Sequence, residues 1–409
     1  MKFNPYKPNG IVSPGMFFGR LEEIETAERA LFQAKNRNPQ HFIFEGERGI
    51  GKSSLAFYVE IVAQGEIDLP DNTKFNFVTV SLDLAGVNTK LGIIRQIGRA
   101  LKSKISQRPD YAVYAKQAWG FLKDWEILGV KYNEKTQDYD EDQALDELIE
   151  SFVRFESDLG DTHDGVFLFI DEADSPPVDA GLGEVMKTFT ERLTKRRCER
   201  VLIGLAGLPI LIQKLRESHP SSPRVFQIVN LSTLFPVERI SVIESGLRQA
   251  NLKNEVQVSI SGAAAELISD LSEGYPHFLQ QFSYFSFDVC KGEVINVSDV
   301  EQGAYMENGA LSQLGDKYFS EMYHAKIWSE EYRKVLKFMA SFGDAWVSRK
   351  DIVAGCDVSD SNINNALGAL KSREIIIADV SRRGFYRLPT KSFSAWINAL
   401  DKKDGQTVV

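Results

Sequence analysis

The sequence predicts an α/β core, in which a parallel sheet is sandwiched by helices, followed by an α-helical lid and a C-terminal winged helix. Three observations lead to this fold class. A glycine-rich loop joins an apolar run to a helical pattern near residue 46, a second apolar run ends in Asp171-Glu172, and the segment 331–409 carries three short helical patterns and a basic hairpin. A chain of 409 residues is too long for one hydrophobic core, so two or three domains are expected.

The composition is that of a soluble globular protein, with 43% hydrophobic and 26% charged residues and a net charge of −9. The longest nearly apolar run, from Val201 to Ile212, covers about half a bilayer and contains glycine and proline, so no membrane association is expected. Residues 1–8 lack the apolar core of a signal peptide. Three scattered cysteines without metal-ligand spacing favour buried thiols in a reducing cytoplasm.

A phosphate-binding loop is predicted between the apolar run 41–45 and the helical pattern that starts near residue 52. It fits the Walker A pattern G-x4-G-K-[ST], whose glycines allow consecutive backbone N–H groups to surround a phosphate at a helix N-terminus. The lysine is expected to reach the β- and γ-phosphates, and the next hydroxyl to ligate Mg2+. The predicted nucleotide-binding residues of the loop are Gly46, Arg48, Gly49, Ile50, Gly51, Lys52, Ser53 and Ser54.

An ordinary glycine turn is the alternative for this loop, but the strand before it and the helix after it argue against that reading. The chain is therefore predicted to have the α/β core of a P-loop NTPase. Its expected cofactors are ATP or ADP with Mg2+.

A second strand over 75–84 and an amphipathic helix over 91–101 follow the loop. The segment 106–142 interrupts the alternation of strand and helix patterns. It combines tryptophans and tyrosines with an acidic run near its end. Two interpretations stay open for it: a solvated helical insertion on the core, or a surface that binds a protein partner. A helical pattern resumes over 143–155.

The continuous apolar run 166–170 is typical of a strand buried on both faces, and it ends in Asp171-Glu172, the Walker B pattern. At the carboxyl end of such a strand, Asp171 is expected to hold Mg2+ beside the phosphate loop, together with Ser53. Glu172 is expected to polarise the attacking water. The same letters can merely end a strand, but here they follow the Walker A loop by a domain-sized interval. We therefore predict an ATPase with Glu172 as a catalytic residue.

The core continues with a helix over 184–197, a buried strand over 201–207, a helix near 208–215 and a strand over 227–231. From residue 236 the periodicity is helical, with helices expected over 237–250, 261–271 and 277–290. A Gly-x-Pro turn at 274–276 separates the last two helices. A glycine C-cap followed by a proline at a helix start accounts for that turn without any nucleotide.

The segment 331–409 has the pattern of a winged helix. Helices are expected over 332–342, 348–353 and 359–371, followed by a hairpin with Gly384 at its turn. The segment holds thirteen Lys/Arg and nine Asp/Glu, a net charge of +4, which leaves −13 on the rest of the chain. Such a reversal fits a surface that faces phosphates.

Duplex DNA is therefore one candidate partner of the winged helix, and the alternative is that the wing packs against the lid or a protein. The residues expected at DNA are Lys371, Arg382, Arg383 and Arg387, with Asn362, Asn364 and Asn365 on the outward face of the third helix.

The Walker A loop, the Walker B strand, the Gly-x-Pro lid and the winged helix follow one another as in AAA+ initiator-type (origin-recognition-type) and STAND ATPases. The chain resembles these families over nearly its whole length outside 106–142. The resemblance implies that the Phe-Phe-Gly-Arg motif at 17–20 lies on the adenine side, with Phe18 and Arg20 near the nucleotide. It also implies that Pro276 packs near the adenine.

The same resemblance implies an arginine finger that reaches the γ-phosphate of a neighbouring subunit, and hence an ATP-dependent homo-oligomer. Arg224 is the first candidate and Arg216 the second, and a loop arginine paired with a surface carboxylate is the alternative. The strand 201–207 departs from the family: where a polar sensor-1 residue is expected, it holds Leu-Ala-Gly at 205–207. This departure predicts slow hydrolysis.

The expected domains are the core over 1–234, with the insertion near 106–142, the lid over 235–308, a linker over 309–330 and the winged helix over 331–409. Two functions stay open. One is a switch that couples ATP binding and slow hydrolysis to DNA association or assembly. The other is a signalling or defence-type STAND ATPase whose winged helix and insertion bind a protein partner.

Overall fold

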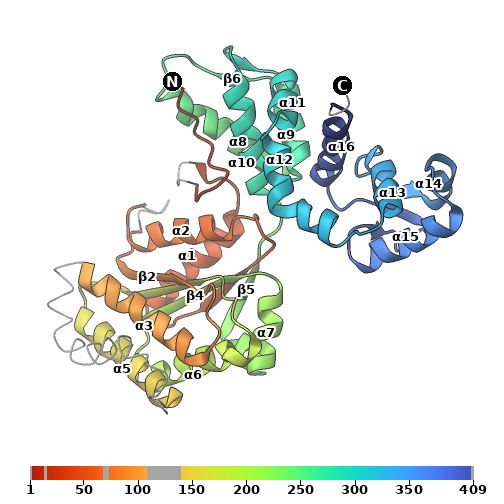
Figure 1. Ribbon diagram of the computed structural model, residues 1–409. Coiled ribbons are helices and arrows are strands. Elements are labelled where there is room, and N and C mark those ends of the chain that lie inside the picture. The colour runs from red at the N-terminus through yellow and green to blue at the C-terminus, as the bar shows by residue number, and fades with distance from the viewer. Residues whose placement is uncertain (1, 13–15, 68–72, 108–139, 407–409) are drawn as a thin grey trace, which may run out of the picture. The chain divides into compact units, whose positions relative to one another are not determined.

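The computed structural model describes residues 2–12, 16–67, 73–107 and 140–406. The chain divides into two compact units, of which one is Arg20–Ser232 and the other combines Met1–Gly19 with Thr233–Val409. Most of the expected insertion near 106–142 lies outside the described residues. Each unit is described below by itself (Figure 1).

The unit Arg20–Ser232 is built on a parallel sheet of five strands in the order β2-β3-β4-β1-β5. Strands β3 and β4 are buried along nearly their whole length. Each has a neighbouring strand on both sides, and helices cover both of its faces. The strands are β1 (His41–Glu45), β2 (Phe77–Asp83), β3 (Gly165–Asp171), β4 (Val201–Gly207) and β5 (Phe226–Asn230). The parallel sheet predicted from the apolar runs is confirmed.

Helices cover both faces of this sheet (Figure 1). Alternate strand residues face opposite sides, so phenylalanines such as Phe42 and Phe169 gather on one face, and aliphatic residues such as Ile43 and Leu168 face the other. Gly204 lies between rings, because a Cβ there would stand 2.8 Å from Phe169 and 2.9 Å from Phe42. The helices are α1 (Leu21–Lys35), α2 (Lys52–Ala63), α3 (Lys90–Gln107), α5 (Glu141–Leu159), α6 (Leu182–Lys195) and α7 (Ile210–Ser218).

The second unit begins with the N-terminal arm, which the sequence analysis assigned to the core. The buried hydroxyl of Tyr6 donates a 2.6 Å hydrogen bond to the carbonyl of Ile243, and the amide of Asn4 donates to the carbonyl of Tyr284 at 2.9 Å. Ring and backbone contacts of this kind attach the arm to the lid helices. The core unit therefore starts at Arg20 and not at residue 1.

The lid is helical, as expected, and a short parallel pair of strands, β6 (Ser259–Ile260) and β7 (Val294–Ile295), closes one end of it. The Gly-x-Pro turn falls between α9 and α10, and Pro276 occupies the first turn of α10. Proline fits there because the first N–H groups of a helix have no partner within it. The helices are α8 (Pro236–Asn251), α9 (Gly262–Ser272), α10 (Pro276–Val289) and α11 (Val297–Tyr305).

The segment 309–330, expected as a linker, is instead mostly helical and packed. It forms α12 (Ala310–Leu314) and two π-helical turns, Gly315–Phe319 and Glu321–Ala325. Leu314, Phe319 and Tyr323 are buried in the same core as the lid. The pattern did not reveal this helix because π-helical turns shift the apolar spacing away from 3.6 residues.

The winged-helix segment consists of α13 (Glu330–Ala340), α14 (Arg349–Gly355), α15 (Asp360–Ser372) and a small antiparallel sheet. Its strands, in the order β8-β10-β9, are β8 (Val347–Ser348), β9 (Ile377–Ala378) and β10 (Phe385–Arg387). The side chain of Ser359 caps α15, as predicted. A further helix, α16 (Lys391–Gln406), follows the wing and was not predicted.

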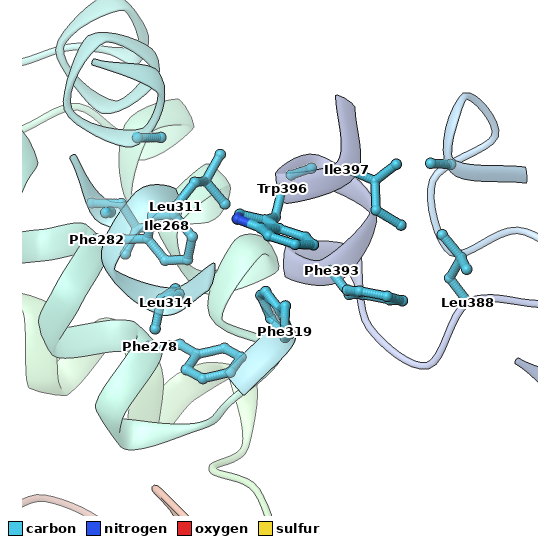
Figure 2. Close-up of a cluster of buried hydrophobic side chains, with 14 of the residues drawn as sticks. Ile268, Phe278, Phe282, Leu311, Leu314, Phe319, Leu388, Phe393, Trp396 and Ile397 are labelled. Carbon is cyan, nitrogen blue, oxygen red and sulfur yellow. The ribbon is translucent and has the colours of Figure 1, made fainter. Parts of the chain in front are cut away.

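Helix α16 packs against the lid through a cluster of aromatic rings (Figure 2). The ring centroid of Phe319 lies 5.2 Å from that of Phe393 and 5.8 Å from that of Trp396, and Phe278 of α10 lies 6.1 Å from Phe319. Gly315 lets the indole approach, because a Cβ there would stand 1.9 Å from Nε1 of Trp396. Lid and winged helix thus share one hydrophobic core.

Candidate functional site

The phosphate loop lies between β1 and α2, as predicted. Gly49 and Gly51 have φ angles of 80° and 98°, values that favour glycine. The N–H of Gly46 donates to the carbonyl of Gly207 at 3.2 Å, which fixes the start of the loop to the end of β4. The first turn of α2 has no acidic residue and no side-chain cap at Gly51. Its N–H donors are therefore available to an anion, which the helix dipole also favours.

Lys52 folds back over the loop that precedes it. Its Nζ donates hydrogen bonds to the carbonyls of Gly46 at 2.7 Å and Glu47 at 3.0 Å. Burial lowers the pKa of the Lys52 ammonium below its usual value, although the carboxylates of Asp171, Asp174 and Glu47 act in the opposite direction. The ammonium thus lies against the loop, and its expected contact with the β- and γ-phosphates stays a prediction.

Walker A and Walker B residues meet at Ser53 and Asp171. The Ser53 hydroxyl donates a 2.6 Å hydrogen bond to Oδ2 of Asp171, although the two residues are 118 positions apart in the chain. Oδ1 of the same carboxylate accepts from the N–H of Glu172 at 2.8 Å. Hydroxyl and carboxylate oxygens are ligands that Mg2+ prefers.

The residues present therefore fit a nucleotide phosphate with Mg2+. Ser53 and Asp171 are the residues that would hold the metal, and the loop N–H groups with Lys52 are those that would hold the phosphates.

Glu172 lies directly beyond β3, with an exposed side chain and a φ angle of 48°. A non-glycine residue in this left-handed region carries backbone strain, which in many proteins accompanies a functional position. The carbonyl of Glu172 accepts from the N–H of Ser175 at 2.9 Å, so the turn that holds it is closed. Its carboxylate can thus face solvent next to the metal-ligand pair.

Arg20 is 6% exposed and lies behind the phosphate loop. Its Nη2 donates to the carbonyl of Ile50 at 3.1 Å, and its Nη1 pairs with Glu23 at 3.1 Å. The structure thus gives Arg20 a contact to the loop itself. The expected contact with nucleotide stays a prediction. Arg48 is exposed, and Ser54 is partly buried in the first turn of α2.

At the end of β4, where a polar sensor-1 side chain was expected, stands Gly207. The carboxylate of Asp174, from the loop after β3, occupies the neighbouring space: its Oδ1 accepts from the N–H of Leu208 at 2.9 Å. The sequence pattern assigned no role to this aspartate. Its contact depends on how two strands end side by side, which no local pattern reveals.

The two arginine-finger candidates are both exposed. Arg224 lies in the 3-10 turn Ser222–Val225, directly before the edge strand β5, and Arg216 lies in the last turn of α7. Neither forms a salt bridge within the described part of the chain. A finger acts on another subunit, so this role stays a prediction.

Phe18 and Pro276 belong to the second unit. The guanidinium of Arg248 lies 5.7 Å from the ring of Phe18, and Pro276 opens α10 beside Tyr275, its N-cap. Both residues are partly buried. Their contacts with nucleotide stay predictions.

On the wing, Arg382 and Arg383 are exposed and lie between β9 and β10 with Gly384, whose φ angle is 84°. Nε of Arg382 pairs with Oδ2 of Asp379 at 2.6 Å, and its guanidinium lies 4.7 Å from the ring of Phe385. Arg383 forms no ion pair with any other described residue. Of the residues expected on α15, Lys371, Asn364 and Asn365 are exposed and Asn362 is partly buried.

No protein-family model matches this chain, and no curated protein matches its sequence. Solved structures do match its fold. The Walker-type ATPase PABY2304 of Pyrococcus abyssi has a TM-score of 0.51 and 15% identity, over 93% of this chain and 96% of that chain. The ORC2 protein of Aeropyrum pernix, solved as ADPNP–ADP complexes, has a TM-score of 0.53 and 14% identity, over 100% and 99%. The chain thus shares the fold of these two proteins. Among its described residues, no helix has the length and hydrophobicity needed to cross a membrane.

Proposed function

We propose that this chain binds ATP or ADP with Mg2+ at the phosphate loop, hydrolyses ATP slowly, and acts as a switch that couples nucleotide state to DNA association or assembly. The observation that carries the proposal is the pairing of Ser53 with Asp171 at 2.6 Å beside Lys52, because it joins the two Walker motifs in one place. The ORC2 protein, which has the same fold, is described in complexes with ADPNP and ADP.

Each residue has a distinct task in this proposal. Bound Mg2+ would neutralise phosphate charge and act as a Lewis acid. Loop N–H groups and Lys52 bind and orient the phosphates, and Ser53 with Asp171 supplies oxygen ligands. Glu172 accepts a proton from the attacking water, which requires its carboxylate to be ionised. The non-polar end of β4 supports slow turnover, since no side chain of Leu205, Ala206 or Gly207 can donate to the γ-phosphate.

The proposed association with DNA or with further copies of the chain is argued from two places: the wing and the edge strand of the sheet. Arg383 and Val380 are exposed at the wing, and the side chain of Arg382 is 50% exposed. Arg224 stands exposed next to an edge strand, where a second copy of the chain could receive it. An ATP-dependent homo-oligomer is therefore part of the proposal.

The alternative is a signalling or defence-type switch that binds a protein through the winged helix and the segment 106–142. One observation favours it: Asp379 already offsets the charge of Arg382, which reduces what that arginine offers to a phosphate.

The test of ATP binding is a titration of the full chain with a fluorescent ATP analogue in the presence of Mg2+. Lys52→Ala should weaken affinity at least tenfold, or about 1.4 kcal/mol. Lys195→Ala, which removes an exposed lysine of α6 in the same unit, is the control and should leave affinity unchanged. Equal affinity of Lys52→Ala and wild type would contradict the phosphate-loop assignment.

The test of hydrolysis uses Glu172→Gln, which keeps the shape of the side chain and removes the base. This variant should bind ATP with wild-type affinity and release no phosphate above background. Glu191→Gln, on an exposed position of α6, should hydrolyse at the wild-type rate. Wild-type turnover by Glu172→Gln would remove Glu172 from the catalytic role.

A further inference from the structure

A single peptide group connects the phosphate loop to the loop that follows the Walker B strand. It is the peptide between Gly207 and Leu208, at the end of β4. Its carbonyl, on Gly207, accepts from the N–H of Gly46 at 3.2 Å, and its N–H, on Leu208, donates to Oδ1 of Asp174 at 2.9 Å. A peptide group is planar, so a displacement of one hydrogen-bonding end moves the other.

Asp174 is held firmly in this place. Its backbone carbonyl accepts from Nζ of Lys214 at 2.6 Å, and the same ammonium donates to the carbonyl of Pro176 at 3.1 Å. The preceding residue, Ala173, donates its N–H to the carbonyl of Ala206 at 2.9 Å. The loop after β3 is thus fastened to β4 and α7 from several directions.

The packing leaves no room for a side chain at the end of β4. A Cβ on Gly207 would stand 2.9 Å from Oδ1 and 3.2 Å from the backbone nitrogen of Asp174. Cδ2 of Leu211 would lie 2.8 Å from the same Cβ, so Asp174 and Leu211 together occupy the space that a side chain at the end of this strand would otherwise use.

Two further hydrogen bonds connect the Asp174–Leu208 contact with the ammonium of Lys52. Gly46 is the first residue of the phosphate loop, and its carbonyl accepts from Nζ of Lys52 at 2.7 Å. The hydrogen-bonded path runs from Asp174 through the Gly207–Leu208 peptide to Gly46, and from Gly46 to Lys52. The negative charge of Asp174 also acts on the Lys52 ammonium.

We propose that Asp174 is a positioning residue, which sets the place of Gly46 and of the phosphate loop through its hydrogen bond to the last peptide of β4. This inference rests on the proposed nucleotide binding for its consequence, but its structural part can be measured without nucleotide. Asp174 thereby links the loop that binds phosphate to the loop that carries Glu172, two positions before it.

The test compares Asp174→Ala, which removes the acceptor, with Asp174→Asn, whose amide oxygen can still accept from Leu208. Amide hydrogen exchange of the nucleotide-free chain is followed in fragments that cover 45–51 and 205–211. Asp174→Ala should speed exchange at Gly46 and Leu208 at least about tenfold, the lower end of the range for the loss of one hydrogen bond to a charged group. Asp174→Asn should stay within about twofold of wild type, as should Asp161→Ala, a control at an exposed aspartate of the same unit.

Nucleotide kinetics supply the second measurement. In Asp174→Ala the KM for ATP should rise about tenfold while kcat changes less than about threefold, because the displaced loop binds phosphate less well and Glu172 remains. Asp174→Asn should restore the KM. Should Asp174→Ala fail to fold, Gly207→Ala tests the same contact from the other side. Its methyl group would meet the carboxylate of Asp174 as well as Leu211, and it should speed exchange at Gly46.

Two outcomes would overturn the inference: wild-type exchange in Asp174→Ala, or equal losses in the Ala and Asn variants, which would assign the effect to charge. Absence of ATP binding by the wild-type chain would instead refute the proposed function. The exchange measurement would then still decide the structural link.

Discussion

Nη2 of Arg20 donates a 3.1 Å hydrogen bond to the carbonyl of Ile50, so a buried cation braces the phosphate loop just before Gly51. Arg20→Ala would leave that carbonyl and the carboxylate of Glu23 without this partner. We expect ATP affinity to fall by about three- to tenfold, the range for the loss of one ordinary hydrogen bond, and the melting temperature to fall with it. Nucleotide titration and thermal unfolding measure the two effects. Arg29→Ala, at an exposed position of α1, should change neither.

Asp171→Asn is expected to alter the Mg2+ dependence of ATP binding more than the binding itself. The amide keeps a hydrogen bond with Ser53 but loses the charge that attracts a divalent cation. The Mg2+ concentration for half-maximal ATP binding should rise at least tenfold, and affinity measured with EDTA should stay near the wild-type value. Asp161→Asn is the matched control. An unchanged Mg2+ midpoint would show that Asp171 is not a metal ligand.

Glu273 should make the stability of the second unit depend on pH. Burial raises the pKa of this carboxyl to about 7, with a contribution from Asp344, although the backbone N–H and the charge of Lys391 act in the opposite direction. In an unfolded chain the pKa of Glu is about 4.3. The folded state thus binds a proton that the unfolded state releases, so the stability from this group is complete below about pH 4 and is lost as pH rises through 7.

Glu273→Gln removes the titratable carboxyl group. The amide oxygen of the glutamine can still accept the hydrogen bond that Oε2 receives from the N–H of Lys391. The melting temperature of the wild type should therefore fall more steeply between pH 5 and 8 than that of Glu273→Gln. Glu266→Gln, at an exposed site on α9, should retain the wild-type slope. Parallel melting curves for wild type and Glu273→Gln would refute the assignment.

Substitutions of the wing arginines test whether the winged helix binds DNA. Arg383→Ala should weaken binding to all duplex sequences about equally and flatten the dependence of log affinity on log salt by about one unit. Arg382→Ala should have a smaller effect, because Asp379 already neutralises part of that charge. Filter binding across salt concentrations measures the slopes, and Lys334→Ala, an exposed lysine of α13, controls for net charge. If wild type and Arg383→Ala share one slope, the wing does not contact phosphates, and a protein partner becomes the better proposal.

Much of the core could be predicted from sequence because its signals are local. A strand buried on both faces needs an unbroken apolar run, and the runs that end at Glu45 and Asp171 are such strands. The glycine loop is equally local, since its φ angles limit which residues fit. Helix α16 was missed because small, polar and aromatic residues alternate in it without a clear stripe, and only the aromatic rings of the lid show which face is buried.

Contacts between distant segments could be predicted only where a known motif links the two segments. Ser53 and Asp171 were placed together by the motifs, and the structure places them within one hydrogen bond. No sequence motif links Asp174 with Gly46, because their connection depends on the hydrogen-bond register at the ends of β1, β3 and β4. The same reason explains why the N-terminal arm was assigned to the core. Its contact partners follow the entire segment Arg20–Ser232 in the sequence, and no local pattern indicates them.

That arm has a consequence for the order in which the protein can fold during synthesis. Tyr6 emerges from the ribosome early, but Ile243, whose carbonyl it bonds, is made 237 positions later. The segment Arg20–Ser232 can complete its own core in the meantime, because all five strands of its sheet precede Ile243 in the sequence. The arm is therefore among the last segments to reach its native partners, and a deletion within it is expected to disturb the helices of the lid.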